Sequence, residues 1–339
     1  MAFTVNKIGL SAFFLVVLVN LQPSALSAPQ VPCFFIFGDS LVDGGNNNDL
    51  QTLAKVNYPP YGVDFPKGPT GRFTNGGTTA DFLVLVFLDW SASGLRRIYS
   101  TLCNGARQRN TGEQLGFRIN LNNQLKNHNV TMTRIAGLLG SGASELLNKC
   151  LYYFVIGSND YINNYFVPEY YPTSSMYTPE QYATVLVQQY SQQLKTLYDF
   201  GARKVAVNGI GPVGCAPAEL ARGTNGSACV DWMNKAVQLF NDKLKHLVND
   251  FNTNIKDAKF VYLDAMDLRP TQLIALGIRF LSKPCCNVSN ITGLCIPGET
   301  PCPIRALHAF YDGFHPSEIV NRVVAVASYI ELLKLLINQ

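Results

Sequence analysis

Ser40 is the first residue of this sequence whose type and setting suit chemistry. It follows an apolar run, residues 33–37, through Gly38 and Asp39. We predict that this run is a buried strand, which places Ser40 at the carboxyl edge of a sheet, where parallel α/β proteins bind ligands. A serine there suits nucleophilic attack, and its N–H would face an oxyanion if a helix begins at this point. A structural serine in a tight turn is the alternative.

A nucleophilic serine needs a base, and His315 is the best candidate among four histidines. Asp312 stands three residues before it, so the carboxylate can reach Nδ1–H and leave Nε2 to accept a proton from a serine. An Asp–His contact that caps the last helix is the alternative. His128, in an Asn-rich stretch, and His246, among lysines, are predicted to be solvated, while His308 in a Pro- and Cys-rich loop is ambiguous.

Asn159 adds a polar group with a possible role in catalysis. It lies in Gly-Ser-Asn-Asp, which follows the apolar run of residues 151–156. A side-chain amide held at a strand end suits an oxyanion, because it donates a hydrogen bond without adding charge. An asparagine that only forms a turn is the alternative.

Alternating apolar runs and helical patterns predict the elements that position these residues. The predicted strands are residues 33–37, 151–156, 204–207 and 260–263. One helix begins at Thr178-Pro179 and ends at Gly201. A second carries Trp232, Ala236, Leu239, Leu244, Leu247 and Phe251 on one stripe, and a last helix covers residues 317–336. This alternation predicts an α/β fold with a mainly parallel sheet and helices on both faces.

Composition favours one folded domain and gives no sign of nucleic-acid binding. The chain has 339 residues, of which 47% are hydrophobic and 15% charged, and a net charge of +4 that is spread along the sequence. One basic concentration lacks the interleaved aromatic residues that stack on bases. It consists of Arg96, Arg97, Arg107, Arg109 and Arg118.

The first 27 residues have the pattern of a secretory signal peptide. Lys7 precedes an apolar run over residues 8–19, and small residues flank the expected cleavage site after Ser27. A membrane anchor, the alternative, needs about 20 apolar residues, and Asn20 interrupts the run. We therefore predict a signal peptide at residues 1–27, a single domain at residues 28–339 and an exported protein with no later membrane span.

Export makes disulfides the favoured interpretation of the nine cysteines. Cys285, Cys286, Cys295 and Cys302 share one loop, and Cys215 and Cys229 flank another. A zinc site is the alternative, although no Cys-x2-Cys pair occurs. The odd number leaves at least one thiol unpaired or paired between chains. Candidate N-glycosylation sites are Asn129, Asn225, Asn287 and Asn290.

Taken together, these motifs resemble those of the plant-type GDSL esterases and lipases of the SGNH hydrolase superfamily. The resemblance covers nearly the whole mature chain. It is carried by residues 34–48 (FFIFGDSLVDGGNNN), 58–75 (YPPYGVDFPKGPTGRFTN), 157–164 (GSNDYINN), 209–217 (GIGPVGCAP), the loop 285–302 and residues 311–318 (YDGFHPSE).

The resemblance implies a fold, a reaction and a set of roles. The fold is a flavodoxin-like three-layer α/β/α sandwich, and the reaction is hydrolysis of a carboxylic ester in a small molecule or lipid, outside the cell in the cell wall or apoplast. Ser40 would be the nucleophile and an oxyanion donor, Asn159 a second donor, His315 the base and Asp312 the residue that orients it. No metal or organic cofactor is implied.

Residues 85–110 depart from the family pattern, which there supplies a small-residue segment and a glycine oxyanion donor. The interval is shorter than the family's and contains four of the five arginines of the basic concentration, together with Cys103, our candidate for the odd thiol. Gly105 is the best available counterpart of the glycine donor. A gene-model error or a diverged sequence would explain the difference.

Two rival functions stay open. The departure favours a catalytically impaired secreted relative that binds an ester or glycan. Only the predicted disulfides and glycosylation acceptors support the other, a structural or defence-type binding glycoprotein. Retention of Ser40, Asn159, Asp312 and His315 together favours the ester hydrolase over both.

Overall fold

The computed structural model describes residues 29–87, 98–101, 117–223, 228–266 and 270–337. The predicted signal peptide, Cys103, Gly105 and Asn225 lie outside these residues. None of the helices described is both long enough and apolar enough to cross a membrane.

Five parallel strands form one sheet in the order β2-β1-β3-β4-β5. The strands are β1 (Phe34–Gly38), β2 (Ile98–Thr101), β3 (Leu151–Val155), β4 (Lys204–Asn208) and β5 (Lys259–Leu263). The four predicted strands are confirmed with small shifts at their ends. The edge strand β2 was not predicted; it lies in the interval that departs from the family pattern.

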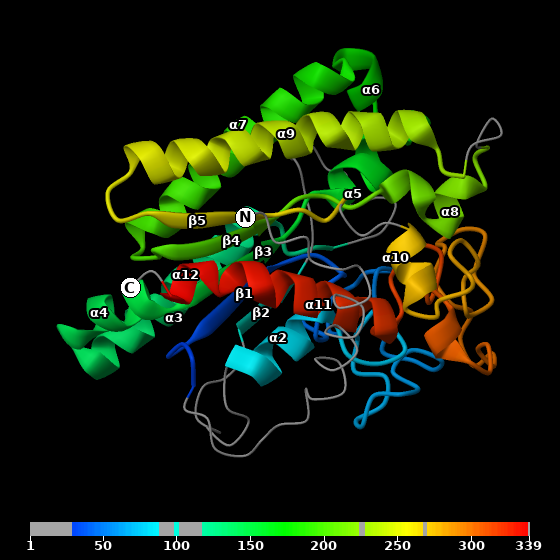
Figure 1. Ribbon diagram of the computed structural model, residues 1–339, viewed down its shortest axis with the longest axis horizontal. Helices are drawn as coiled ribbons and strands as arrows, with labels where there is room; N and C mark the ends of the chain where they lie inside the picture. The colour runs from blue at the N-terminus through cyan, green and yellow to red at the C-terminus, as the bar shows by residue number, and fades with distance from the viewer. Residues whose placement is uncertain (1–28, 88–97, 102–116, 224–227, 267–269, 338–339) are drawn as a thin grey trace, which may run out of the picture.

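Helices cover both faces of this sheet (Figure 1), which confirms the predicted three-layer α/β/α architecture. The longer helices are α2 (Thr79–Phe87), α3 (Leu121–Leu139), α4 (Gly142–Lys149), α7 (Pro179–Asp199), α9 (Asp231–Asn254) and α11 (Glu318–Leu332). The shorter ones are α5 (Ser158–Asp160), η1 (Tyr161–Tyr165), α6 (Thr173–Met176), η2 (Val213–Cys215), α8 (Pro217–Leu220), α10 (Pro270–Ala275), η3 (Arg305–Leu307) and α12 (Lys334–Ile337).

Alternate strand residues pack into two separate hydrophobic cores. Phe35 and Phe37 of β1 face α3, α7 and α9, whereas Phe34 and Ile36 face α2 and α11. The strands β1, β3 and β4 are buried on both sides, so they occur in the sequence as largely apolar runs rather than as alternating patterns.

The helix α7 begins as the sequence predicts. Thr178 accepts a hydrogen bond from the N–H of Gln181, and the Gln181 side chain accepts one from the N–H of Thr178. This capping box satisfies donors that the first turn leaves free, and Pro179 needs no donor at the first position.

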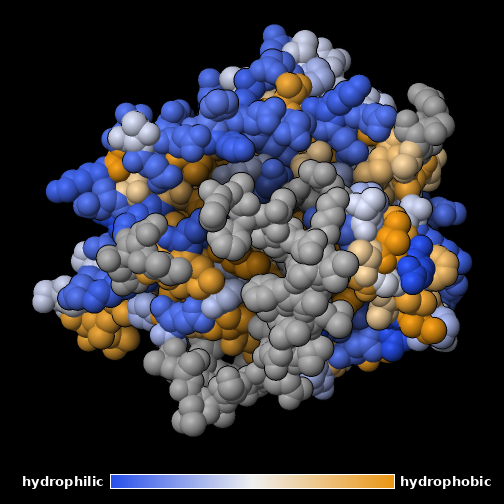
Figure 2. Space-filling view, viewed as in Figure 1, coloured by the Kyte–Doolittle hydropathy of each residue, from blue (hydrophilic) through white to orange (hydrophobic). Residues whose placement is uncertain are grey.

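The predicted stripe of α9 is wrong at its first residue. Trp232 is 53% exposed and packs edge-on against Phe166, with 5.0 Å between the ring centroids. The buried stripe begins one residue later and consists of Met233, Ala236, Val237, Phe240, Asn241, Leu244, Val248 and Phe251. Figure 2 shows that the opposite, outward surface over α7 and α9 is mainly hydrophilic.

The prediction that His128 is solvated is also wrong. Its side chain on α3 is only 1% exposed and packs edge-on against Phe35, Phe37 and Tyr152. Neither ring nitrogen has a hydrogen-bond partner among the described residues, and burial lowers the pKa of His128 to about 4. The helical position decides its burial, because His128 shares the sheet-facing stripe of Leu121 and Leu125 despite its polar neighbours in sequence.

Four disulfides confirm the predicted use of the cysteines. The bonds are Cys33–Cys150, Cys215–Cys229, Cys285–Cys302 and Cys286–Cys295. The first joins the residues that precede β1 and β3, and the last two tie down the loop that leads to His315. Cysteines paired in this way are not thiolates, so this loop holds disulfides rather than the alternative zinc site.

Candidate active site

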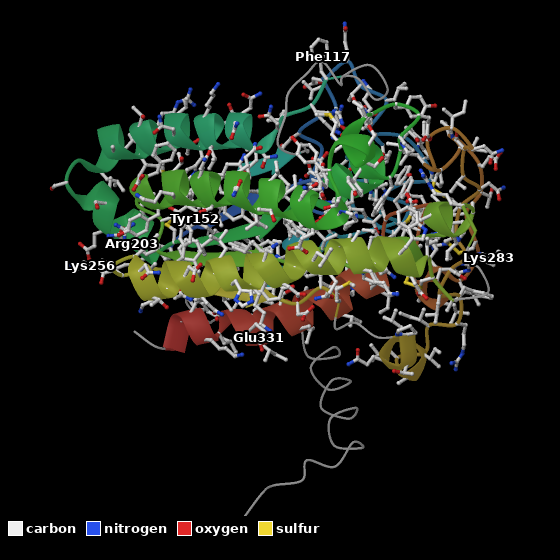
Figure 3. The ribbon with its side chains drawn as sticks, turned by 90° about the horizontal axis from the view of Figure 1, so that it is seen from above. Phe117, Tyr152, Arg203, Lys256, Lys283 and Glu331 are labelled. Carbon is white, nitrogen blue, oxygen red and sulfur yellow. A yellow bond between two sulfur atoms is a disulfide. The ribbon has the colours of Figure 1, made fainter. Side chains whose placement is uncertain are left out.

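The carboxyl ends of the strands point away from Arg203 and Lys256, which precede β4 and β5. Figure 3 shows these two residues at one end of the molecule and Lys283, two residues before the disulfide-bonded loop, at the other. The residues predicted to do chemistry follow β1 and β3 or precede α11.

Gly38 allows β1 to end close against β3. A Cβ atom at Gly38 would lie 2.6 Å from the carbonyl oxygen of Val155. The Gln124 side chain on α3 accepts the N–H of Gly38 and donates to its carbonyl, at 3.2 and 3.0 Å. The glycine is therefore explained by a close approach between strands rather than by a sharp bend.

Ser40 lies in a turn. No helix begins at this point, although the sequence analysis considered one. The N–H of Val42 donates to the carbonyl of Asp39, and the N–H of Leu41 to the Asp39 carboxylate. Within the described part of the chain, the Ser40 N–H donates no hydrogen bond. The turn thus leaves this N–H available at the carboxyl edge of the sheet.

The structure brings Ser40, His315 and Asp312 into one hydrogen-bonded chain. His315 Nε2 lies 2.8 Å from Ser40 Oγ, and His315 Nδ1 lies 2.8 Å from Asp312 Oδ2. Ser40 is 8% exposed, His315 7% and Asp312 0%. This geometry matches a general base aligned between a nucleophile and an orienting carboxylate.

Asp312 is held by several donors besides His315. Its Oδ1 accepts the backbone N–H groups of Phe314 and His315, each at 2.8 Å. Its Oδ2 accepts the hydroxyl of Tyr61 at 2.5 Å. The Phe73 ring packs against the imidazole, with 4.7 Å between centroids. Sequence reasoning missed both aromatic residues, although each lies in the block of residues 58–75.

The other histidines lie elsewhere. His246 is exposed on α9, as predicted. His308, the ambiguous one, is buried, and its Nδ1 lies 3.0 Å from the carbonyl oxygen of Lys283. His315 is therefore the histidine that the structure pairs with Ser40.

Asn159 is hydrogen-bonded to Asp39, the residue that precedes Ser40. Its Nδ2 donates to Asp39 Oδ2 at 3.3 Å, and its Oδ1 accepts from Asn163. These contacts orient the amide, which carries a second Nδ2–H. Gly157 precedes it with φ of 121°, a conformation that favours glycine, and the π-helical turn η1 follows.

A model of the family described as GDSL-like Lipase/Acylhydrolase matches residues 34–327. The chain belongs to this family. It is 45% identical over 323 residues to GDSL esterase/lipase At1g29670 of Arabidopsis thaliana, covering 90% of this chain and 88% of the relative. It is 44% identical over 342 residues to GDSL esterase/lipase At5g45670 of the same plant, with 95% and 94% covered.

The GDSL family membership confirms the resemblance inferred from the sequence. The candidate glycine donor of that resemblance, Gly105, lies outside the described residues. Of the candidate glycosylation sites, Asn129, Asn287 and Asn290 are exposed, and Asn225 lies outside the described residues. In the described part of this GDSL protein, no group of three or more His, Cys, Asp or Glu residues is placed to hold a metal ion.

Two buried carboxyl groups adjoin this GDSL site. Burial is the main cause that raises the pKa of Asp39 to about 6 and the pKa of Asp160 to about 7. The charge of Asp39 raises the pKa of Asp160 further, whereas Arg118 lowers it. One carboxyl oxygen of Asp160 has no hydrogen-bond partner among the described residues. Asp160 thus favours its neutral form.

We expect Asp160→Asn to stabilise the protein more at pH 8 than at pH 5. In the unfolded chain Asp160 loses its proton near pH 4, but in the folded chain only near pH 7. The folded state binds more protons between these values, so the parent loses stability as pH rises through this range. The gain in Tm of the variant over the parent should therefore be several degrees larger at pH 8.

Thermal unfolding by circular dichroism checks this, with Asp250→Asn, at an exposed position on α9, as the control. An equal gain in Tm at both pH values would contradict the assignment of a buried, reluctantly ionised Asp160.

Proposed function

We propose that this protein hydrolyses carboxylic esters through an acyl-enzyme formed on Ser40. The observation that carries the proposal is the hydrogen-bonded chain from Ser40 Oγ through His315 to Asp312. Membership of a family of lipases and acylhydrolases supports the same reaction.

Acylation begins when His315 Nε2 removes the proton from Ser40 Oγ as the oxygen bonds to the acyl carbon. Asp312 stabilises the imidazolium that forms. The imidazolium then gives its proton to the leaving alcohol oxygen, the carbon–oxygen bond breaks, and the acyl group stays on Ser40. Water then removes the acyl group by the same steps. His315 accepts a proton from the water molecule as its oxygen bonds to the acyl carbon, and later returns that proton to Ser40 as the carboxylic acid leaves.

The negative oxygen of each tetrahedral intermediate needs fixed donors. The Ser40 N–H and the second Nδ2–H of Asn159 are the proposed donors, because the first has no other described acceptor and the second is oriented through Asp39 and Asn163. Gly105 stays a third candidate from the sequence.

The proposed substrate is an ester of a small molecule or lipid, and the proposed location is outside the cell. The four disulfides support export, because such bonds persist in oxidising compartments. The pattern of residues 1–27 supports it independently.

We expect kcat for a p-nitrophenyl ester to rise between pH 5 and pH 8. A base must be unprotonated to accept the Ser40 proton, and a histidine side chain changes charge in this pH range. The rate should thus follow the neutral imidazole and level off above its midpoint. Initial rates at saturating substrate across this range measure it.

Asp39 requires a control, because burial raises its pKa to about 6, within the same range. Asp39→Asn should keep the rise in rate if His315 is the base. A rate that is flat from pH 5 to pH 8 in the parent, or a rise that vanishes in Asp39→Asn, would count against His315.

A further inference from the structure

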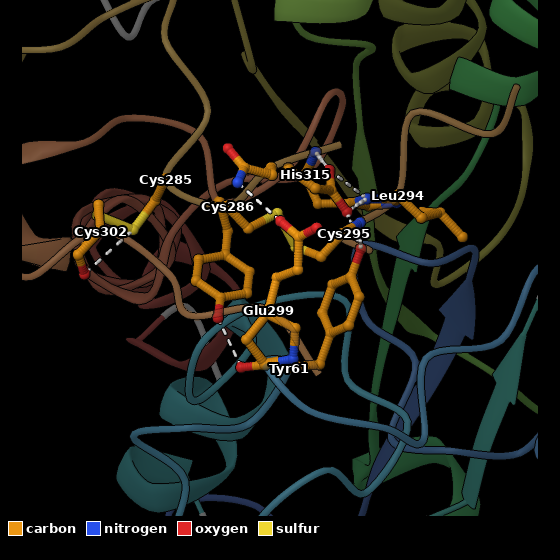
Figure 4. Close-up of a disulfide and its surroundings, with 12 residues drawn as sticks. Tyr61, Cys285, Cys286, Leu294, Cys295, Glu299, Cys302 and His315 are labelled. Atoms are coloured by element: carbon orange, nitrogen blue, oxygen red, sulfur yellow. Dashed lines mark hydrogen bonds and ion pairs between the residues drawn. A yellow bond between two sulfur atoms is a disulfide. The ribbon is translucent and has the colours of Figure 1, made fainter. Parts of the chain in front are cut away.

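A buried tyrosine links the disulfide-bonded loop to the proposed triad. Tyr61 is 1% exposed, and its hydroxyl lies 2.5 Å from Asp312 Oδ2. The same hydroxyl oxygen accepts the N–H of Cys295 at 3.0 Å. Figure 4 shows the Tyr61 side chain reaching up to this junction, next to His315 and the Cys286–Cys295 bond. The reaction steps proposed above make no use of this residue.

The direction of these two hydrogen bonds is fixed. A backbone N–H only donates, so the phenol oxygen accepts from Cys295, and an ionised carboxylate only accepts, so the phenol proton points to Asp312. Burial and the nearby Asp312 carboxylate raise the pKa of Tyr61 well above its ordinary value. The phenol therefore keeps its proton and stays a donor.

The Tyr61 hydroxyl binds the Asp312 carboxylate oxygen that accepts no hydrogen bond from the backbone among the described residues. Both backbone donors, the N–H groups of Phe314 and His315, bind Oδ1. Among the described residues, Oδ2 has only Tyr61 besides the imidazole. The Tyr61 ring is itself enclosed by Tyr58, Phe73 and Tyr311, with centroids 5.5 to 6.3 Å away.

We propose that Tyr61 is a positioning residue of the triad: its hydroxyl, oriented by the Cys295 amide, holds Asp312 in place against His315. The Cys286–Cys295 disulfide keeps that amide in position. This inference rests on the proposed roles of Asp312 and His315.

Loss of the phenol should change how His315 holds its proton. The Tyr61 hydroxyl donates a hydrogen bond that partly offsets the negative charge of the Asp312 carboxylate. Without it, more of this charge acts on the imidazolium, so the titration midpoint of His315 should move to higher pH. The carboxylate is also held less firmly, which lowers kcat and leaves ester binding unchanged.

Tyr58 supplies a matched control. Its hydroxyl donates to the carbonyl oxygen of Cys295 at 3.0 Å, and its ring packs edge-on against Tyr61. Tyr58→Phe therefore removes a phenol hydrogen bond to the same loop residue without removing one from Asp312. Two other titratable groups are unchanged in both variants: Asp39, which interacts electrostatically with His315, and Tyr311, whose pKa the charge of Asp312 raises.

The test is an NMR titration of histidine-labelled protein, with the His315 signal assigned through His315→Gln. We expect the His315 midpoint in Tyr61→Phe to lie about half a pH unit or more above that in Tyr58→Phe and the parent. On a p-nitrophenyl ester, kcat of Tyr61→Phe should fall about tenfold at the pH plateau, with KM unchanged. Equal midpoints in all three proteins would overturn the proposal.

A second substitution keeps the test open if Tyr61→Phe does not fold. 3-Fluorotyrosine at position 61 is a stronger donor of nearly the same shape, so the midpoint should move to lower pH, and an unmoved midpoint would overturn the proposal. The titration needs no turnover. A protein without esterase activity therefore contradicts the proposed function while the NMR result still decides the role of Tyr61.

Discussion

Ser40→Ala is expected to remove hydrolysis of a short p-nitrophenyl ester, with a loss in kcat of about 10⁶-fold or down to the uncatalysed background. The substitution deletes the oxygen that forms the acyl-enzyme. The Ser40 side chain makes its hydrogen bond to His315, and the turn is held by backbone groups and by Asp39. The fold should therefore be unchanged by the substitution, as measured by Tm.

Ser158→Ala is the control, because this serine lies at the same edge of the sheet and has no part in the proposed steps. It should keep the parent rate. Turnover by folded Ser40→Ala comparable to the parent would mean that another group carries the reaction.

Asn159→Ala is expected to lower kcat about 10²–10³-fold with little change in KM. This is the loss typical of one oxyanion donor, whose hydrogen bond strengthens only as the negative charge develops. Initial rates measured over a range of ester concentrations separate kcat from KM. Thermal unfolding of the same sample shows the folded fraction.

Asn164→Ala separates this role from that of an asparagine that only shapes the turn. Asn164 lies in the π-helical turn η1, which follows the short helix of Asn159, and its side chain accepts a hydrogen bond from Thr173. The Asn164→Ala variant should be less stable than the parent but keep the parent kcat per folded molecule. If Asn159→Ala behaves in the same way, within a few-fold of the parent, Asn159 is structural.

The sequence predicted most of the fold because its main elements are locally encoded. The strands β1, β3 and β4 were identifiable because burial on both faces makes them apolar runs, and β5 from its short apolar run, residues 260–263. The start of α7 was identifiable from Thr178 and Pro179. The strand β2 was not, because it lies at the sheet edge within an interval that lacks the family pattern. His128 was misjudged because its polar neighbours were given more weight than its helical spacing.

The contacts of the candidate site were predictable only between residues that lie close together in the sequence. Asp312 and His315 are three positions apart, so their contact follows from local geometry. Tyr61 contacts Asp312 across 251 positions of chain, and no local spacing encodes such a contact. Its one available signal was membership of the block at residues 58–75, which carried the family resemblance without a stated role for this residue.

The central claim is that Ser40 is an activated nucleophile, and reaction with a fluorophosphonate followed by mass spectrometry of the peptides tests it most directly. The account predicts one phosphonyl group per folded chain, on the peptide that contains Ser40, with fluoride released and esterase activity lost in proportion. A folded protein that takes up no label, as expected for a catalytically impaired relative, or that is labelled at another residue, would contradict it.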